Sequence, residues 1–446
     1  MRLEFSEFGD LVSVQACLPG CEDSEAISQQ FSSYRGFVSI NRDSDNLFTF
    51  ERHDGDHSFQ IEFRNLVSGE SRRWRIPHRG FLLGLEISRP QGVSMASGED
   101  FRPRAVNGFS AWLESLRYVQ IKEGTAHLFD INESVSMPRT SNDWMGFKNR
   151  FWVAMIRPEQ ATRVTTRDGS ELNELQLDLH STAAAPHRFT IYAGPVEQHA
   201  LEDANAELGA VVYSGLWQWS GWLSGAFQSA LKTIDSMIHN LGLGIIVLAL
   251  LLQVVLWPVS MKAIELWAGV RETRARLAPQ FRSVDSRYRG QQRAEHITAI
   301  YRQENVHPLY QLKGFAGLLV LIPVLVCAFQ ALAENIWLYE MKFLWIADLS
   351  LPDAAIELHF GLPLFGNHVN LLPFIVFAIS LSASWMLHRS RARTLSNPIR
   401  WRKVYGLPIL FLILFYTVPA GMVLFLAVTI AIITLQLLIR SKRAPG

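Results

Sequence analysis

The sequence predicts a mixed fold in two parts: a large antiparallel β-sandwich over about residues 1–212, and an all-α membrane part over about residues 241–440. Of 446 residues, 49% are hydrophobic and only 19% are charged. The first 240 residues nevertheless resemble an ordinary soluble protein, so the apolar excess lies in the second half. Short segments of alternating polarity fill the first half. The second half contains apolar runs close to the ~20 residues that a helix needs to cross a bilayer.

The first half reads as strands. The segment around an Asp54-Gly55 turn signal predicts a hairpin with one buried face. Its apolar residues recur at every second position: Phe48, Phe50, Phe59, Ile61 and Phe63. Leu175, Leu177 and Leu179 alternate in the same way. Many short strands with little helical periodicity are typical of a large antiparallel sandwich.

Two small patterns in this half have two interpretations each. His53, Asp54, Asp56 and His57 could form a metal cluster, but a solvated hairpin tip explains them more simply, and we expect no metal. The Cys17-Leu-Pro-Gly-Cys21 segment could close a disulfide across a turn in an oxidising compartment. The alternative is two unpaired thiols.

Residues 213–240 predict an amphipathic helix just outside the first apolar run. Its apolar residues recur at helical spacing: Trp219, Trp222, Leu223, Ala226, Phe227, Ala230, Leu231, Ile234, Met237 and Ile238. A helix rich in tryptophan at this place is expected to lie in the outer headgroup layer. The alternative is a helix packed on the sandwich.

The apolar runs predict five membrane spans. The first, from Leu241 to Val259, is interrupted only by Gln253. The others are expected at about 314–332, 371–387 and 404–439, where Pro419-Ala-Gly421 divides the last run into two short spans.

Charge sets the orientation of these spans. Residues 262–313 hold ten basic and five acidic side chains, and 388–403 hold six basic and none acidic, whereas 338–370 hold one lysine and four acids. A basic tail, 441–446, follows the last span. Because positive loops stay in the cytoplasm, the first half is expected outside, which in a bacterium is the periplasm. Since 1–20 lack an export signal, we expect an upstream signal anchor that this chain does not include.

The loop 262–313 predicts a helical hairpin with its turn at Gly290. Its arginines could contact RNA, acidic proteins or anionic lipid, or could serve only to fix topology. The candidate contact residues are Arg271, Arg274, Arg282 and Arg289, with Arg276, Arg287 and Arg293 in the same segment.

An ordered series of segments resembles the YidC-type membrane protein insertases of bacteria. It comprises "GLGIIVLALLLQVVLWPVSMKA", "IYRQENVHPLY", "LIPVLVCAFQAL", "FLWIADLSLPD", "LSNPIRWRKVYGLPILF" and "VPAGMVLFLAV". Weaker likeness continues into the first half at "NDWMGFKNRFWVAMI", "FTIYAGP" and "FGDLVSVQACLPG". The resemblance covers 240–440 well and implies a periplasmic β-supersandwich, an interfacial helix and five core helices. It also implies that the family's first membrane anchor is absent here.

The resemblance implies an insertase and chaperone of the bacterial inner membrane, without a cofactor. A groove among the helices, open to the cytoplasm and to lipid, would take up hydrophilic segments of a client and release its apolar segment into lipid. The implied partners are nascent membrane proteins, the bilayer, and the ribosome and translocon; no nucleic-acid sequence is implied.

Polar residues in the cytoplasmic halves of the expected spans are candidates for the groove: Gln253, Ser380, Ser384, Thr434 and Gln436. Close packing and interhelical hydrogen bonds are the alternative, and they explain the serines better than Gln253. Relatives typically carry arginine five residues before the Trp257-Pro258 step, where this chain has Gln253. The groove is therefore expected to be uncharged and less suited to acidic clients.

Two other classes of function compete. One is a membrane-tethered carbohydrate-binding or scaffolding protein with a vestigial groove, which aromatic residues clustered with carboxylates in a sandwich cleft would favour. The other is a membrane enzyme. The sequence has no P-loop, HExxH or GxSxG motif, so we expect no enzymatic activity.

Overall fold

The structure is a computed structural model that describes residues 1–18, 27–33, 36–40, 48–89, 92–98, 101, 104, 108–130, 142–169, 174–180, 186–212, 214, 220–362, 366–395 and 401–443. The chain forms two compact units. The first comprises Met1–Gly221, Leu332–Phe374 and Leu410–Val423. The second comprises Trp222–Ala331, Ile375–Ile409 and Leu424–Gly446. Two segments of the helical half thus belong to the same unit as the strands.

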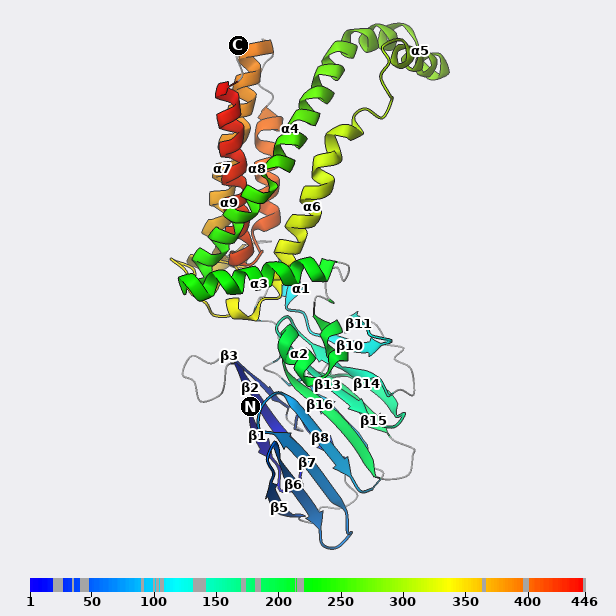
Figure 1. The fold of residues 1–446 in the computed structure, drawn as a ribbon, viewed down its shortest axis with the longest axis vertical. Coiled ribbons are helices and arrows are strands. Elements are labelled where there is room, and N and C mark those ends of the chain that lie inside the picture. Colours follow the sequence, from blue (N-terminus) through cyan, green and yellow to red (C-terminus); the bar gives the residue numbers. More distant parts are fainter. Residues whose placement is uncertain are drawn as a thin grey trace. The chain divides into compact units, whose positions relative to one another are not determined.

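The first unit contains a seven-stranded antiparallel sheet in the order β1-β2-β4-β9-β15-β14, with β3 paired to β2 (Figure 1). Its strands are β1 (Arg2–Phe5), β2 (Leu11–Leu18), β3 (Ile27–Ser32), β4 (Val38–Ile40), β9 (Val93–Ala96), β14 (Arg163–Gly169) and β15 (Glu174–His180).

A nine-stranded antiparallel sheet follows the order β11-β10-β12-β13-β16-β8-β7-β6-β5. Its strands are β5 (Phe48–Asp54), β6 (Ser58–Asn65), β7 (Ser71–Pro77), β8 (Leu82–Ile87), β10 (Arg117–Lys122), β11 (Thr125–Asp130), β12 (Trp144–Lys148), β13 (Trp152–Pro158) and β16 (His187–Pro195). The antiparallel β-sandwich that the sequence predicts is therefore confirmed.

Apolar side chains of both sheets form one core. Phe31 and Leu177 come from the seven-stranded sheet, and Trp74, Phe147 and Trp152 from the nine-stranded sheet. A second cluster joins Val119 and Tyr192 of the larger sheet to a short helical segment, α2 (Gln198–Ala204) and η2 (Ala206–Val211). Both faces of the nine-stranded sheet are thus partly buried, and it offers an extended surface against which other segments pack.

The predicted hairpin is confirmed, but its buried face is incomplete. Phe50 pairs with Phe63 across β5 and β6, and Phe63 is buried. Phe50, however, is 69% exposed, which corrects the expectation. The reason is topological, since β5 is the edge strand and has a neighbour on one side only. Leu175, Leu177 and Leu179 are buried as predicted.

The remaining elements are mostly helical. They are α1 (Gly108–Leu113), α3 (Gly221–Ile238), α4 (Leu241–Arg287), α5 (Gly290–Gln303), α6 (Leu312–Ala333), η4 (Ile336–Leu338), the hairpin β17 (Ile356–Leu362) and β18 (Gly366–Val369), α7 (Leu371–Leu395), α8 (Trp401–Phe415) and α9 (Ala420–Arg443). Among the described residues, α4 alone is long and apolar enough to cross a membrane by length and composition. Four shorter apolar stretches lie at Leu319–Ala333, Leu371–Met386, Val404–Phe415 and Ala420–Gln436.

The first predicted span does not end as a separate helix. α4 continues without a break through Pro258 and Pro279 to Arg287, because good helix formers follow Ser260. The chain then turns, and Gly290 adopts a φ of +61° that favours glycine. α5 returns along α4, where Gln280 bonds Glu304 and the rings of Phe281 and Tyr301 meet (Figure 1).

Three smaller expectations have mixed outcomes. Cys17 is disulfide-bonded and Cys327 is a free, buried thiol; Cys21, the predicted partner of Cys17, lies outside the described residues. On α3, Phe227 and Leu231 are buried, whereas Trp222 and Met237 are exposed, so its apolar residues divide between protein contacts and the surface. Trp219 and the end of the basic tail, 444–446, also lie outside the described residues.

Candidate functional site

Gln253 lies on α4 inside the apolar run and is 1% exposed. Its amide oxygen and nitrogen are both buried, and neither has a hydrogen-bond partner among the described residues. A buried polar group without a partner costs about 1–3 kcal/mol. An amide in such a place calls for water or another polar group beside it.

Other buried polar side chains of the second unit share this property. Ser380 on α7, and Thr429 and Gln436 on α9, are buried and have unpartnered polar atoms in the described part of the chain. The predicted set is otherwise mixed. Thr434 donates its hydroxyl to the Ile430 carbonyl one helical turn away, and Ser384 is only half-buried.

These residues place buried polar atoms on three helices of one unit. Apolar neighbours cannot form hydrogen bonds with them. Water, or polar groups of another chain, would satisfy them. In contrast, Ser224 on α3 donates to Gln330 on α6 at 3.2 Å, and the Phe329 and Phe425 rings meet at 5.9 Å. Hydrogen bonds and aromatic packing therefore join α6 to its neighbours, and the unpartnered atoms lie on α4, α7 and α9.

The predicted hairpin arginines are on the surface. Arg271, Arg274, Arg282 and Arg289 are exposed, and Arg271 donates its Nε to the Trp267 carbonyl at 3.3 Å. Two other arginines of this segment are engaged within it. Arg276 approaches Glu304 at 3.7 Å, and Arg293 approaches Asp285 at 2.6 Å.

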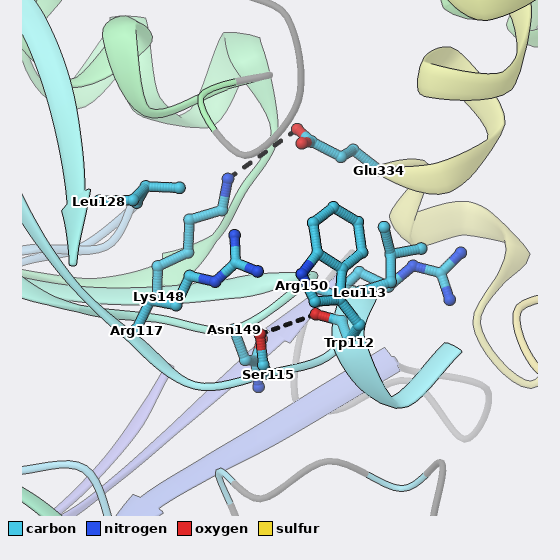
Figure 2. Close-up of a pocket in the computed structure, with 9 residues that line it drawn as sticks. All are labelled: Trp112, Leu113, Ser115, Arg117, Leu128, Lys148, Asn149, Arg150 and Glu334. Atoms are coloured by element: carbon cyan, nitrogen blue, oxygen red, sulfur yellow. Dashed lines mark hydrogen bonds and ion pairs between the residues drawn. The ribbon is translucent and has the colours of Figure 1, made fainter. Parts of the chain in front are cut away.

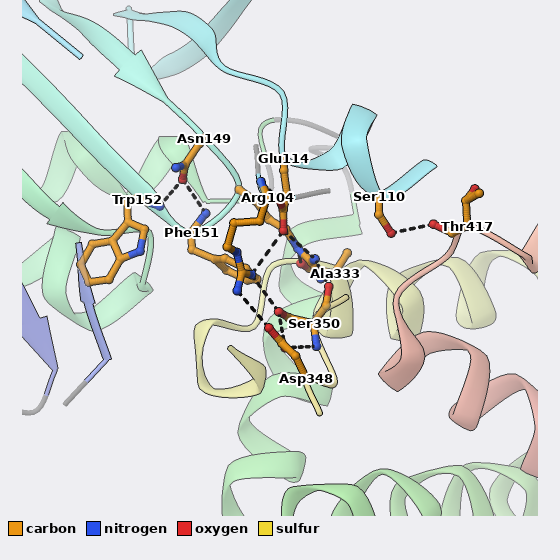
Figure 3. A network of polar contacts seen from close by, with 11 residues as sticks. Arg104, Ser110, Glu114, Asn149, Phe151, Trp152, Ala333, Asp348, Ser350 and Thr417 are labelled. Atoms are coloured by element: carbon orange, nitrogen blue, oxygen red, sulfur yellow. Dashed lines mark hydrogen bonds and ion pairs between the residues drawn. The ribbon is translucent and has the colours of Figure 1, made fainter. Parts of the chain in front are cut away.

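The first unit holds a second set of polar residues, which we call the polar junction: Arg104, Glu114, Lys148, Arg150, Glu334, Asp348 and Ser350. It joins the sandwich to the segments that precede and follow η4 (Figure 3). Arg104 pairs with Asp348 at 2.9 Å and with Glu114 at 3.3 Å, and its guanidinium lies 3.9 Å from the Tyr339 ring. Arg104 also donates to the Ser350 hydroxyl at 3.0 Å.

Arg150 is the buried centre of the polar junction. Its Nε donates to the Ala333 carbonyl at 2.5 Å and its Nη1 to the Ser350 carbonyl at 2.5 Å. The turn between β12 and β13 aims this side chain, because the Asn149 amide oxygen accepts hydrogen bonds from the backbone of Phe151 and Trp152 (Figure 3). Burial lowers the pKa of Arg150 to about 10, and Glu114 opposes that shift. Arg150 therefore remains charged at neutral pH.

Lys148 lies beside a small cavity that Trp112, Arg117 and Glu334 also line (Figure 2). Its ammonium donates to the Val211 carbonyl at 2.9 Å and pairs with Glu334 at 3.9 Å. Burial lowers the pKa of Lys148, and the Glu334 carboxylate opposes the shift. These contacts hold Lys148 in place and indicate a structural role rather than a reactive one.

A further contact joins α1 to the segment before α9. Ser110 donates its hydroxyl to the Thr417 carbonyl at 2.6 Å, and the Phe109 amide donates to the Thr417 hydroxyl at 3.0 Å (Figure 3). Gly108 makes this approach possible, since a Cβ there would lie 2.2 Å from that hydroxyl oxygen. Two separate segments of the helical half, Leu332–Phe374 and Leu410–Val423, thus contact the first part of the chain in one compact unit.

No local pattern in the sequence indicates the polar junction directly. Lys148 and Arg150 stand in "WMGFKNRFWVAMI", between two strands of buried residues. Two cations so close to apolar strands were a usable signal, because lysine and arginine are seldom fully buried unless they are paired. Their contacts with Ala333, Glu334 and Ser350, however, span 183 to 200 residues of sequence, and no local pattern links the two sides.

The sandwich also has a larger cavity of about 700 Å³. Phe5, Phe59 and Phe81 line it together with His78 and two arginines. Its described lining includes no aspartate or glutamate, so it lacks the pairing of aromatic rings with carboxylates that would favour carbohydrate binding. The β5–β6 turn contains the four residues of the metal alternative, His53, Asp54, Asp56 and His57. Arg52 pairs with Asp54 there at 2.8 Å.

Sequence comparisons identify relatives of both halves. Residues 233–445 match the sequence model of the family described as 60Kd inner membrane protein, and residues 86–225 match that of the YidC periplasmic domain. The membrane protein insertase YidC of Chlorobaculum parvum is 24% identical over 300 residues, which cover 64% of this chain and 49% of that protein. Its counterpart in Chloroherpeton thalassium is 25% identical over 308 residues, covering 65% and 50%. The chain spans about half the length of these curated relatives.

Among solved structures, an active YidC insertase with its first transmembrane domain resolved aligns over 98% of this chain and 89% of that one. The two are 16% identical, with a TM-score of 0.36.

Proposed function

This chain belongs to the YidC family of membrane protein insertases, and from that premise we propose that it is itself an insertase and membrane chaperone. In this proposal, hydrophilic segments of a client enter a polar groove that faces the cytoplasm, and the client's apolar segment passes sideways into lipid. The reaction needs no cofactor and makes or breaks no covalent bond.

The proposed arrangement has five membrane spans, provided by the apolar parts of α4, α6, α7, α8 and α9. The sandwich lies in the periplasm, α3 lies in the outer headgroup layer, and the α4–α5 hairpin projects into the cytoplasm. The charges of the loops support this orientation, as do the exposed Trp222 and Met237 of α3. The membrane is then the bacterial inner membrane.

The observation that carries the proposal is the buried, unpartnered amide of Gln253 in an otherwise apolar run. Ser380, Thr429 and Gln436 supply further unpartnered polar atoms. A hydrated groove would satisfy all of them. Such a groove shortens the low-dielectric path that a translocated segment must cross, which lowers the barrier without energy from a nucleotide.

The neutral amide also predicts which clients the groove accepts. Where relatives typically carry arginine, Gln253 cannot attract a carboxylate by charge, and Coulomb attraction would be strong in a partly dry groove. We therefore propose that this chain accepts clients with neutral or weakly charged hydrophilic segments. Nascent membrane proteins are the proposed partners, with the ribosome at the exposed arginines of the hairpin and a translocon beside the spans.

Complementation tests the function. Cells depleted of their own insertase would express this chain behind a signal anchor that exports its first domain. Growth and correct insertion of a reporter client are expected from the unmodified chain. A normal amount of folded protein in the membrane with no rescue would refute the insertase function.

A reconstituted assay tests the groove. Gln253→Arg is expected to increase insertion of a client with an acidic tail by about tenfold relative to a neutral-tailed client, because one ion pair in a partly dry groove is worth about 1–2 kcal/mol. Gln253→Met is the matched control of similar size without charge. Equal insertion of both clients by the arginine variant would contradict the electrostatic account.

A further inference from the structure

A cavity of about 410 Å³ lies in the second unit between α4 and the segment that joins α5 to α6. Lys262 and Glu265 line it from α4, His307 and Tyr310 from the connecting segment, and Lys313 from the first turn of α6. Gly269 leaves its wall open, since a Cβ there would meet no atom within 4 Å.

The connecting segment is fixed by its own hydrogen bonds. Asn305 adopts a φ of +51°, the Val306 amide donates to the Tyr301 carbonyl at 2.9 Å, and the Tyr310 amide donates to the His307 carbonyl at 2.8 Å. The cavity is therefore formed before any ligand binds, which reduces the entropy cost of binding.

The cavity offers donors of hydrogen bonds and an excess of positive charge. Neither the Lys262 nor the Lys313 ammonium has an ion-pair partner in the described part of the chain. His307 Nδ1 accepts a hydrogen bond from the Leu309 amide at 3.1 Å, so the proton of the neutral ring is on Nε2, which is a donor. Glu265 is the one carboxylate among the described lining residues.

Tyr310 is an independent sign of a ligand. Its side chain lines the cavity and is 5% exposed, yet its hydroxyl has no hydrogen-bond partner among the described residues. Its ring lies 6.3 Å from that of Tyr301, which fixes its position. A buried hydroxyl in such a place is expected to bond a group that enters the cavity.

The sequence places this cavity at the boundary between hydrocarbon and water. Lys262 follows the apolar run that ends at Val259, and Lys313 directly precedes the apolar stretch of α6. Beside them the rings of Trp267 and Phe315 meet at 5.1 Å, and aromatic residues are typical of the headgroup layer. In the proposed orientation this is the cytoplasmic leaflet, where anionic lipids are enriched.

We propose that this cavity binds the phosphate of an anionic phospholipid headgroup, with Lys262 and Lys313 as charge partners and Tyr310 as a hydrogen-bond donor. The proposal rests on the membrane orientation given above. The bound lipid would join α4 to the start of α6 at the base of the hairpin.

Native mass spectrometry of the purified full chain tests the site, using phosphatidylglycerol and phosphatidylcholine with the same acyl chains as probes. The unmodified chain is expected to retain phosphatidylglycerol preferentially. Lys262→Gln with Lys313→Gln should weaken the binding of phosphatidylglycerol about tenfold or more, since the double variant loses two charge contacts with the lipid phosphate. Tyr310→Phe should weaken it about threefold, and Glu265→Gln should strengthen it.

The matched control is Arg282→Gln with Arg289→Gln, which removes the same charge from exposed positions of the same hairpin. It should change phosphatidylglycerol binding by less than about twofold, and all variants should unfold at the temperature of the unmodified chain. Equal loss in the control and the lysine variant would overturn the site in favour of diffuse charge. Displacement of the lipid by inorganic phosphate alone would overturn the lipid as its occupant. No client is present, so these outcomes are independent of insertase activity.

Discussion

The Nη1 of Arg150 donates a hydrogen bond of 2.5 Å to the backbone carbonyl of Ser350, 200 residues further along the chain. The same guanidinium bonds the Ala333 carbonyl. One buried arginine thereby holds both ends of the segment that surrounds η4 against the sandwich. A guanidinium suits this task because its donors point in fixed directions.

Arg150→Ala is expected to destabilise the first unit by about 3–5 kcal/mol, because it leaves two buried carbonyls without their donor and leaves Arg104 as the cationic partner of Glu114. Arg150→Lys should recover only part of this, since an ammonium cannot reach both carbonyls in the same geometry. Thermal unfolding, with limited proteolysis of residues 339–353, measures the effect. Arg157→Ala is the control. Arg157 lies on the adjoining strand and pairs with Glu207 at the surface, so its loss should cost less than about 1 kcal/mol.

Lys148 and Glu334 are expected to be energetically coupled. Lys148→Met should cost about 3 kcal/mol, because it removes the hydrogen bond to the buried Val211 carbonyl and the ammonium that lies 3.9 Å from the Glu334 carboxylate. Adding Glu334→Leu should recover part of that loss, since a well-packed apolar pair often replaces a buried ion pair at little cost. A double-mutant cycle from chemical unfolding measures the coupling. Strictly additive losses would show that the two side chains act separately.

Replacing unpartnered polar groups is expected to stabilise the second unit at the expense of function. Gln253→Leu should raise the free energy of unfolding by about 1–3 kcal/mol, and Thr429→Val by about 1 kcal/mol. Gln253→Leu should also reduce insertion of a neutral-tailed client. Thr434→Val is the control, because the Thr434 hydroxyl already bonds the Ile430 carbonyl and its removal should bring no gain. Unfolding in detergent and the reconstituted assay measure the two effects. Destabilisation by Gln253→Leu would argue that the amide has a protein partner.

His187 predicts a pH dependence of the sandwich. The side chain is 2% exposed, and burial lowers its pKa below the ordinary 6.5. Between the lowered folded pKa and 6.5, the unfolded chain binds more protons than the folded one, so stability increases with pH in this window. It should fall as the pH drops below about 6.5. Chemical unfolding at several pH values measures this slope, and His187→Gln should reduce it. An unchanged slope would assign the pH dependence to other groups.

Local pattern predicted much of the fold. Alternation around Asp54-Gly55 and from Leu175 to Leu179 identified strands that the structure confirms. It failed at Phe50, because the pattern gives the face of a side chain but not whether a neighbouring strand covers it. It also placed the end of the first helix too early, since helix length depends on a stop signal that the residues after Ser260 lack.

The candidate sites divide in the same way. Gln253 stood out because one amide in an apolar run is visible in the sequence itself. The polar junction did not, because Arg150 and Ser350 become neighbours only when the chain closes on itself.

The sequence by itself determined the two-part architecture, the strand and helix faces and the unusual amide, because all of these depend on residues a few positions apart. Tertiary structure decided which edge strand is exposed, which helix segments join the sandwich, and which buried polar atoms find partners. Those outcomes depend on contacts between distant segments. A periodic pattern does not indicate which distant segment will pack against a given face.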